Sequence, residues 1–258
     1  MPEIKTNIRE DGVAIVTIHH PERRNACTQD MWEALGKVFT ELPKNPQTRA
    51  IVLTGTGDHF CAGADISEFS KARNDAKAAA NYSRHVDNAE TAIHHAPMPV
   101  IAAIRGSAIG GGCGLAVACD FRIGDEKTRM GIPAARLSVV YSLKETQVLS
   151  EVVGAKNAKR ILFSGDYFDA EGSVRLGLLD EIVDDPLQSA IDYASHIAER
   201  APMSVKGAKL AINAIASGAM ENVHDEYELL RDRAADSLDY AEGQRAFLEK
   251  RKPRFQGR

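Results

Sequence analysis

The chain has 258 residues, of which 44% are hydrophobic and 26% charged, and its formal net charge is −4. This length allows one large globular core, or a core with a smaller appendage, that folds without disulfides or metals. The negative charge disfavours nucleic-acid binding, which uses a strongly basic face to contact phosphates.

Cysteine spacing and hydropathy indicate the cellular environment expected for the protein. The four cysteines form no CxxC pair, so the sequence predicts buried reduced thiols rather than a zinc site. The first 18 residues alternate and carry charges, unlike a signal peptide. The most apolar region, residues 99–119, is interrupted by Arg105 and by glycines, which makes it unfit to span a bilayer. We expect a soluble cytoplasmic protein that binds no metal, membrane or nucleic acid.

Strands alternate with helices through the first two thirds of the chain. β-Branched, apolar runs predict buried strands at residues 13–18, 49–54, 99–104 and 120–124. A helical stripe of apolar residues predicts a helix over 28–42, with Thr28 as its N-cap, and a second helix is expected over 77–94. This alternation is typical of an α/β fold with largely parallel strands.

The pattern changes after about Pro186, where the strands stop. Helices are predicted over 187–200, 204–217 and 222–248. We therefore divide the chain into an α/β core, residues 1–200, and a helical region, residues 201–258. The apolar stripes of this region have little to pack against within it, so they cover either the protein's own core or other subunits.

Two glycine-containing segments each follow a predicted buried strand: FCAGADI (60–66) and IGGGCGLAVACD (109–120). Taken singly, each is weak evidence of a site, because Asp65 is a plausible helix cap and glycines let helices pack closely. The second segment lacks the spacing of dinucleotide and phosphate loops. Together, however, free backbone N–H groups at two helix entrances can converge on one oxygen and form an oxyanion hole.

These segments also carry a resemblance. PERRNAC (21–27), FCAGADI, PVIAAIRGSAIGGGCGLAVACDFRIG (99–124), GAKNAKRILFSGDYFDAEGSVRLGLLDEIV (154–183) and FLEKRKPRF (247–255) together resemble the enoyl-CoA hydratase/isomerase, or crotonase, family. The resemblance covers nearly the whole chain in order. It implies a spiral of ββα units with a C-terminal helical trimerisation region, assembled as trimers or dimers of trimers. It also implies an acyl-CoA thioester as substrate, with no separate cofactor.

The resemblance assigns roles to particular residues. The amides of Ala64 and Gly111 match the family's two oxyanion donors. Lys250 in the tail would reach the phosphates of coenzyme A, from the same or a neighbouring subunit; the alternative is an ordinary solvated terminus. The residues expected along coenzyme A are Arg23, Arg24, Ala26, Ala62, Ala64, Asp65, Ile66 and Lys250.

The sequence departs from the family at the acid–base positions. Hydratases of the family carry two glutamates, and here Gly114 and Ala134 stand in their places. Neither side chain can exchange a proton, so two-glutamate hydration is doubtful. Tyr141 is a candidate replacement, because decarboxylases of the family have a pocket tyrosine in a similar run. The alternative is a packed tyrosine whose hydroxyl lies at the surface.

Other neighbours are weaker candidates. Ser142 aligns with an aspartate that is catalytic in some relatives, but serine cannot replace a carboxylate without an activating base. Asp87 and His85 would serve as a base only if they face inward from the helix over 77–94. Glu145 is more readily explained as a capping or surface residue.

Three hypotheses about function follow. The first is an enoyl-CoA hydratase/isomerase-class enzyme, a lyase or isomerase of fatty acid metabolism, that stabilises a thioester enolate at Ala64 and Gly111 with Tyr141 nearby. The second is decarboxylation or thioester hydrolysis on an acyl-CoA, because loss of CO₂ forms the enolate without a base. The third is a non-catalytic acyl-CoA-binding protein.

Overall fold

A six-stranded sheet forms the centre of the molecule. The computed structural model describes residues 1–68 and 75–258. Strand β1 pairs antiparallel with β2 at one edge, and every other neighbouring pair is parallel. In spatial order the strands are β1 (Glu3–Ile8), β2 (Val13–His19), β3 (Ala50–Gly55), β4 (Val100–Ile104), β6 (Phe121–Gly124) and β9 (Glu181–Ile182).

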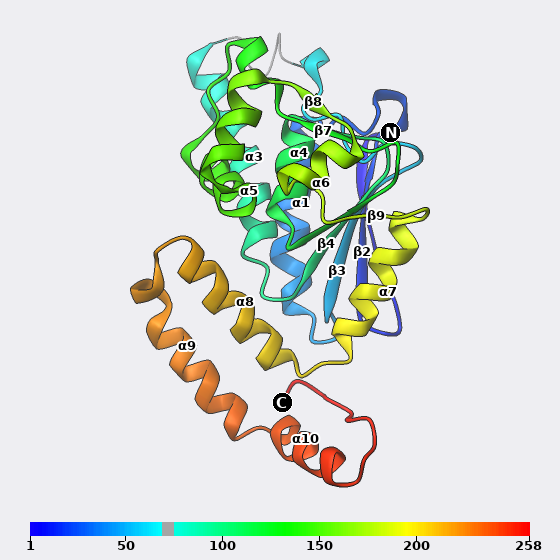
Figure 1. Cartoon of the computed structure of the whole chain (residues 1–258), viewed down its shortest axis with the longest axis vertical. Coiled ribbons are helices and arrows are strands. Elements are labelled where there is room, and N and C mark those ends of the chain that lie inside the picture. Colours follow the sequence, from blue (N-terminus) through cyan, green and yellow to red (C-terminus); the bar gives the residue numbers. More distant parts are fainter. Residues whose placement is uncertain (69–74) are drawn as a thin grey trace.

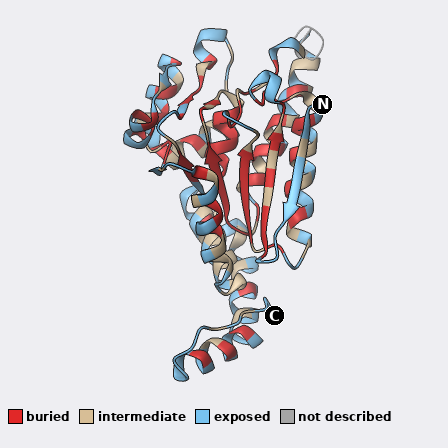
Figure 2. Ribbon diagram, turned by 90° about the vertical axis from the view of Figure 1, so that its right-hand side faces the viewer, coloured by how far each residue is buried: buried red, intermediate tan, exposed pale blue. Residues whose placement is uncertain are grey.

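The inner strands are buried on both faces, which explains their uninterrupted apolar sequences. In β3, for example, Ile51 and Leu53 join the larger core, whereas Val52 joins a smaller core with α7 (Pro186–Ala198) on the opposite face. Figure 2 shows these strands as buried, whereas the edge strand β1 is mostly exposed. The alternation of side chains along each strand thus divides the apolar residues between two cores.

A second, small sheet makes the fold a spiral. It contains β5 (Ser107–Ile109), β7 (Arg129–Gly131) and β8 (Tyr167–Phe168). Isolated bridges Cys27–Ala64 and Cys61–Ala108 add two more extended segments to it. Successive turns of the chain therefore place a long strand in the large sheet, then a short segment in the small one, and then a helix. The helices are α1 (Gln29–Glu41), α3 (Ala76–His94), α4 (Gly111–Ala118) and α5 (Leu143–Ser164).

This architecture confirms the expected α/β spiral of ββα units. Helix α1 begins as predicted, with the Thr28 hydroxyl accepting a hydrogen bond from the Met31 amide at 3.3 Å. Strands of two or three residues, such as β5, β7 and β9, were not predicted, because they are too short to show a period-two pattern. The short helix α6 (Ala170–Leu176) was not predicted either.

Three helices follow α7 and extend toward one end of the molecule (Figure 1). They are α8 (Pro202–Ala216), α9 (Met220–Ala235) and α10 (Leu238–Leu248). The prediction of one helix over 222–248 was wrong, because Ser237 ends it and caps α10 by accepting a hydrogen bond from the Tyr240 amide at 3.0 Å. Within residues 1–68 and 75–258, no helix combines the length and apolar character needed to cross a membrane.

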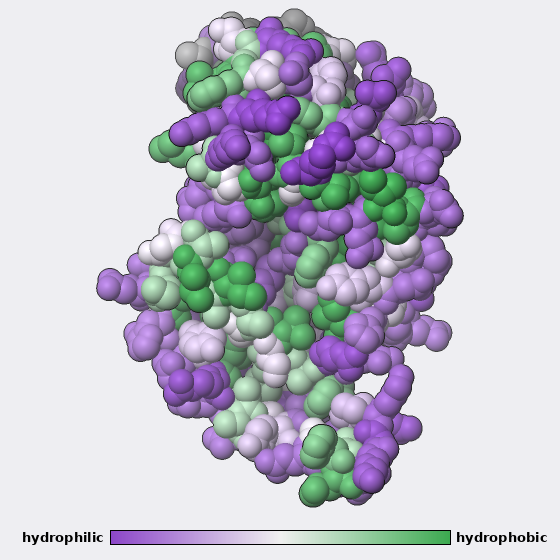
Figure 3. Space-filling view, viewed as in Figure 1, coloured by the Kyte–Doolittle hydropathy of each residue, from purple (hydrophilic) through white to green (hydrophobic). Residues whose placement is uncertain are grey.

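Polar contacts fix these helices to the core. On α8, Lys209 Nζ lies 2.7 Å from Asp120 Oδ2, and both side chains are largely buried. Beyond α10, Arg251 and the Arg254 amide bond to the buried Glu242, and Arg49 donates to the Phe255 carbonyl oxygen at 3.0 Å. Apolar side chains nevertheless gather over the free end of the α8–α9 hairpin and over α10 (Figure 3).

Candidate active site

The two segments expected to lie along coenzyme A run side by side. The Ala62 amide donates to the Arg24 carbonyl oxygen at 3.0 Å, and the Cys27 amide donates to that of Gly63 at 2.7 Å. The Asp65 amide returns a bond to the Cys27 carbonyl oxygen at 2.9 Å. Residues 23–27 and 62–65 therefore form one continuous strip, although almost forty residues of sequence separate them.

Asn25 holds the turn that makes this strip possible. Both Arg24 and Asn25 have left-handed backbones, with φ of 52° and 58°, a conformation that asparagine tolerates better than most residues. The fully buried Asn25 side chain accepts from the His20 amide at 2.9 Å. It also donates to the carbonyl oxygens of Thr56 and His59 at 2.9 and 2.6 Å. The Arg23 and Arg24 side chains are left exposed beside the strip.

The two glycine-containing turns touch each other. Gly63 has φ of +96°, and a Cβ added there would lie 2.7 Å from the Ile109 carbonyl oxygen and 3.4 Å from the Gly111 nitrogen. Only glycine therefore allows this approach. Among the described residues, neither the Ala64 nor the Gly111 amide donates a hydrogen bond. Gly111 is also the first residue of α4, where the helix dipole adds positive potential.

The remaining residues of the expected strip differ in position. Asp65 is buried and caps a short 3₁₀ helix, Ile66–Glu68, by accepting bonds from the Ser67 amide and hydroxyl at 2.9 and 2.7 Å. Ile66 is exposed. Lys250 follows α10, which lies at the opposite end of the molecule from the small sheet that residue 61 joins (Figure 1). Within one chain, Lys250 is thus far from the strip.

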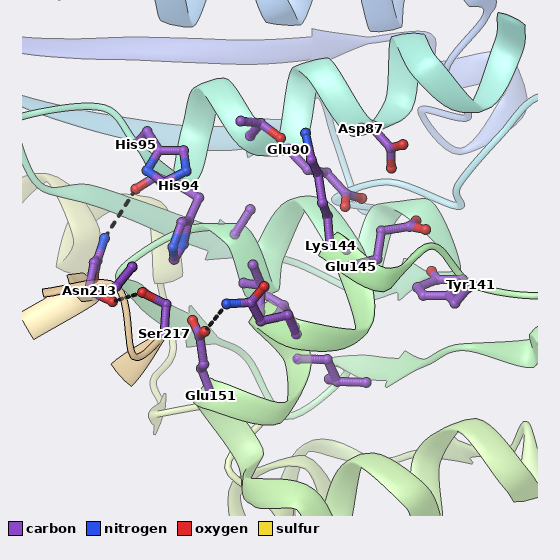
Figure 4. Close-up of a pocket in the computed structure, with 18 of the residues that line it drawn as sticks. Asp87, Glu90, His94, His95, Tyr141, Lys144, Glu145, Glu151, Asn213 and Ser217 are labelled. Carbon is purple, nitrogen blue, oxygen red and sulfur yellow. Dashed lines mark hydrogen bonds between the residues drawn. The ribbon is translucent and has the colours of Figure 1, made fainter. Parts of the chain in front are cut away.

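A cavity of about 280 Å³ lies between α3, α4, α5 and the α8–α9 hairpin. Gly114, one turn along α4 from Gly111, lines it. Figure 4 shows the carboxylates of Asp87, Glu90 and Glu145 with Tyr141 toward one end, and His94, His95, Asn213, Ser217 and Glu151 toward the other. Its polar lining includes Asp87, Glu90, Thr91, His94, His95, Tyr141, Lys144, Glu145, Gln147, Glu151, Asn213 and Ser217.

Glu90 is a functional candidate that was not among the residues singled out from the sequence. Its carboxyl is buried against Gly114, so that a Cβ added at Gly114 would overlap Glu90 Oε1 and lie 2.9 Å from Cδ. Oε1 has no hydrogen-bond partner among the described residues. Burial raises the pKa of Glu90 well above its ordinary value, and the charges of Glu145 and Asp87 raise it further. An acid of this kind in a cavity is typical of functional sites.

The pattern of α3 contained a signal for Glu90. Tyr82, Val86, Ala89 and Ile93 form the buried stripe of this helix. Because Glu90 follows Val86 by four residues, it falls on the same face. An acid on a buried helical stripe was therefore readable from the sequence, although the glycine that makes room for it lies on another helix.

The hydroxyl of Tyr141 is buried, so the alternative that placed it at the surface was wrong. The oxygen has no hydrogen-bond partner in the described part of the chain. Burial raises the pKa of Tyr141 well above its ordinary value, and nearby Glu145 and Glu90 add to the effect. The ring contacts the main core. Tyr141 thus brings a neutral hydroxyl into the same cavity as Glu90.

The other candidates have definite contacts. Ser142 caps α5, since its hydroxyl accepts from the Glu145 amide at 3.2 Å and the Ser142 amide donates to the Glu145 carboxylate at 2.8 Å. This confirms the capping role of Glu145. The Ser142 hydroxyl donates to Asp87 at 2.9 Å, so Asp87 faces the cavity. His85, by contrast, is not among the described residues that line it.

The far end of the cavity is polar but uncharged at His94. Burial, with smaller contributions from His95 and Lys209, lowers the pKa of His94 to about 4, so its imidazole is neutral at pH 7. The Asn213 amide donates to the His94 carbonyl oxygen at 3.4 Å and joins α8 to this wall. In the described residues, no cluster of three or more His, Cys, Asp or Glu side chains is arranged to hold a metal ion.

Known proteins share both the sequence pattern and the fold. A family model described as enoyl-CoA hydratase/isomerase matches residues 8–258. The chain belongs to the enoyl-CoA hydratase/isomerase family. It is 32% identical over 252 residues to the short-chain-enoyl-CoA hydratase of Clostridium acetobutylicum, covering 95% of this chain and 94% of the other.

Solved structures agree with this assignment. An enoyl-CoA hydratase/isomerase family protein from Hyphomonas neptunium has a TM-score of 0.93 and 35% identity, covering 100% of this chain and 98% of that one. The enoyl-CoA hydratase of Bacillus anthracis has a TM-score of 0.91 and 28% identity, with 99% of both chains covered. These relatives establish the family and the crotonase fold.

The contact between the two turns leads to a test at Gly63. Gly63→Ala should lower the free energy of unfolding by about 1–2 kcal/mol for its positive φ, and by roughly 1–3 kcal/mol more for the clash with Ile109. Gly57→Ala is the matched control, because Gly57 also has positive φ (+73°) but nothing within 4 Å of an added Cβ. Urea unfolding measures both; equal losses would show that the close approach is not needed.

Proposed function

We propose that the protein is an acyl-CoA enzyme whose reaction passes through a thioester enolate. One observation carries this proposal: the unbonded amides of Ala64 and Gly111 belong to two turns that touch at Gly63. Two N–H donors fixed before the reaction stabilise a developing oxyanion without reorganisation. Each such donor contributes about 3–4 kcal/mol to a transition state.

In this proposal the thioester carbonyl oxygen accepts from both amides. Coenzyme A lies along the strip of residues 23–27 and 62–65, with Arg23 and Arg24 exposed to its phosphates. The acyl chain enters the cavity that begins one turn along α4, at Gly114. Coenzyme A is part of the substrate, and no separate cofactor is required by this chemistry.

The proposed reaction class is lyase or isomerase, as in the named relatives, but with different acid–base groups. Gly114 and Ala134 bring no carboxylate, which argues against hydration by a pair of glutamates at these positions. Decarboxylation is the second candidate, because loss of CO₂ yields the enolate directly and the neutral, buried Tyr141 hydroxyl is available to the product. Activity on crotonyl-CoA, on branched malonyl-CoAs and on saturated thioesters distinguishes hydration, decarboxylation and hydrolysis.

We also propose that the chain assembles as a homotrimer or a dimer of trimers through residues 201–258. Although Lys209 and Asn213 tie α8 to its own core by hydrogen bonds, the C-terminal helices expose large apolar side chains, among them Leu229, Phe247 and Leu248. Figure 3 shows apolar surface in this region. Patches of this kind mark protein interfaces. Association would also allow Lys250 of one subunit to contact coenzyme A bound to another.

We also propose a cytoplasmic location. The four free, buried cysteines fit this setting, because thiols stay reduced there.

The oxyanion role of Gly111 is tested by comparing two substitutions. Gly111→Pro deletes the amide proton, whereas Gly111→Ala keeps it; both add a Cβ about 3.0 Å from the Trp32 ring. Proline is tolerated at the first position of a helix. Turnover of the proline variant should fall about 10²–10³-fold below that of the alanine variant. Steady-state kinetics on the active thioester measures this, and equal rates would refute the role.

Tyr141→Phe should lower kcat on that thioester while leaving binding nearly unchanged. Its hydroxyl has no protein partner among the described residues, so the melting temperature should not fall. The kcat and the dissociation constant of an unreactive thioester are the measurements. A parallel loss in both, together with a lower melting temperature, would assign Tyr141 to packing.

Light scattering after size exclusion should give three or six times the mass of one chain. Replacing both Phe247 and Leu248 by Asp should shift the protein toward single chains, because both side chains are at least 80% exposed in one chain. Gln244→Asp, on the same helix and also exposed, is the control and should leave the mass unchanged. A single-chain mass for the unaltered protein would contradict the proposed assembly.

A further inference from the structure

The cavity is lined by a buried acid, Glu90, whose Oε1 has no hydrogen-bond partner among the described residues. We infer that Glu90 is the catalytic residue that removes and returns the proton on the carbon next to the thioester carbonyl. This inference rests on the proposed function, because it takes the carbonyl to be held by Ala64 and Gly111. It assigns proton transfer to α3, a different helix from the one that supplies the oxyanion donor.

Position is the first argument. Gly114 follows Gly111 by three residues on α4, which corresponds to a rise of about 4.5 Å. The Glu90 carboxyl lies against Gly114, in the space that any side chain there would fill. The carboxyl is therefore about one helical turn from the amide proposed to hold the carbonyl oxygen. The carbon bonded to that carbonyl lies within the same reach.

The missing partner is the second argument. Glu90 is only 8% exposed, and its Oε1 finds no donor among the described residues. A buried carboxyl normally satisfies its hydrogen bonds, and the cost of leaving one unmade is about 1–3 kcal/mol. An acid that serves the fold alone would gain from a partner. An acid that serves a substrate must keep an oxygen available until the substrate binds.

The electrostatic setting suits proton transfer at an unactivated carbon. Asp87 on α3 and Glu145 on α5 face Glu90, with Tyr141 and Cys113 close by, and burial in this group raises the pKa of Glu90. A carboxylate with a raised pKa is a stronger proton acceptor than an exposed one. The same property makes its protonated form easier to retain until the proton is returned.

The proposed step moves a proton and electron pairs only between the substrate and Glu90. A carboxylate oxygen of Glu90 takes the proton, the C–H electron pair forms a C=C bond to the carbonyl carbon, and the carbonyl pair moves onto oxygen. The amides of Ala64 and Gly111 hold that oxyanion. If the proton on Glu90 is first replaced by a deuteron from the solvent, its delivery to the same carbon gives α-exchange, whereas delivery to the γ-carbon of a 3-enoyl thioester shifts the double bond. Apart from solvent, neither outcome needs an added reactant.

The test uses the 258-residue chain and trans-3-hexenoyl-CoA in D₂O, with deuterium in the recovered thioester measured by mass spectrometry. The unaltered protein should exchange the α-protons, and Glu90→Gln should slow exchange by about 10²–10⁴-fold. Asp87→Asn tests the rival base, because Asp87 also faces the cavity but already accepts a hydrogen bond from Ser142. Losing part of that bond should slow exchange by less than about tenfold, well short of the loss in Glu90→Gln. A larger loss in Asp87→Asn than in Glu90→Gln would overturn the assignment.

A folding control comes from the same variant. Because the pKa of Glu90 is raised in the folded state, its contribution to stability is complete below the unfolded pKa and is lost as pH rises toward the folded one. Glu90→Gln should therefore melt no lower than the unaltered protein, with an advantage that grows as pH rises above the unfolded pKa of a glutamate. Melting curves in the presence of acyl-CoA report binding independently of exchange.

Moving the carboxyl supplies the sharpest comparison. Glu90→Ala should lose exchange, and adding Gly114→Glu to it should restore at least a tenfold gain, because the second change places a carboxyl in the vacated space. A folded double variant without any gain would show that the carboxyl is not acting from this position.

The outcomes separate the role of Glu90 from the proposed function. If acyl-CoA binds and raises the melting temperature but the unaltered protein exchanges nothing, only the assignment of Glu90 fails. If acyl-CoA does not bind, the proposed function fails with it.

Discussion

The close approach of two backbone turns is the constraint on which the rest of the site depends. Gly63 lets the turn after β3 rest against Ile109 and Gly111 at the start of α4. The turn at Arg24 and Asn25 then pairs with the same segment through the Ala62 and Cys27 amides. Three stretches of chain, each following a strand of the large sheet, are thereby held by main-chain contacts. Among the described residues, the amides of Ala64 and Gly111 in these stretches have no hydrogen-bond partner.

Much of this arrangement was predictable because it is encoded locally. Buried strands, the Thr28 cap and the glycine-containing turns each have a pattern within a few residues of sequence. The short strands of the small sheet lack such a pattern, since two or three residues do not define a period. The break at Ser237 was missed for a related reason. Its capping bond to Tyr240 competes with an otherwise continuous helical sequence.

The acid in the cavity escaped prediction for a different reason. Gly114 looked like the loss of a function when read alone, and Glu90 was not singled out among the residues of the helix over 77–94. Only the packing of α3 against α4 connects Gly114 with Glu90, because the glycine leaves the volume that the carboxyl occupies. A site that depends on side chains from different helices is set by tertiary packing, which sequence patterns around either residue do not contain.

The same packing couples the cavity to the C-terminal helices. Asn213 on α8 contacts the end of α3 at His94, and Lys209 on α8 binds Asp120 beside β6. The α8 helix therefore closes one side of the cavity while its neighbours α9 and α10 present apolar surface. In the proposed assembly, a subunit that covers this surface would also restrict α8 and with it one wall of the cavity. The proposed assembly would in this way affect the space proposed for the acyl chain.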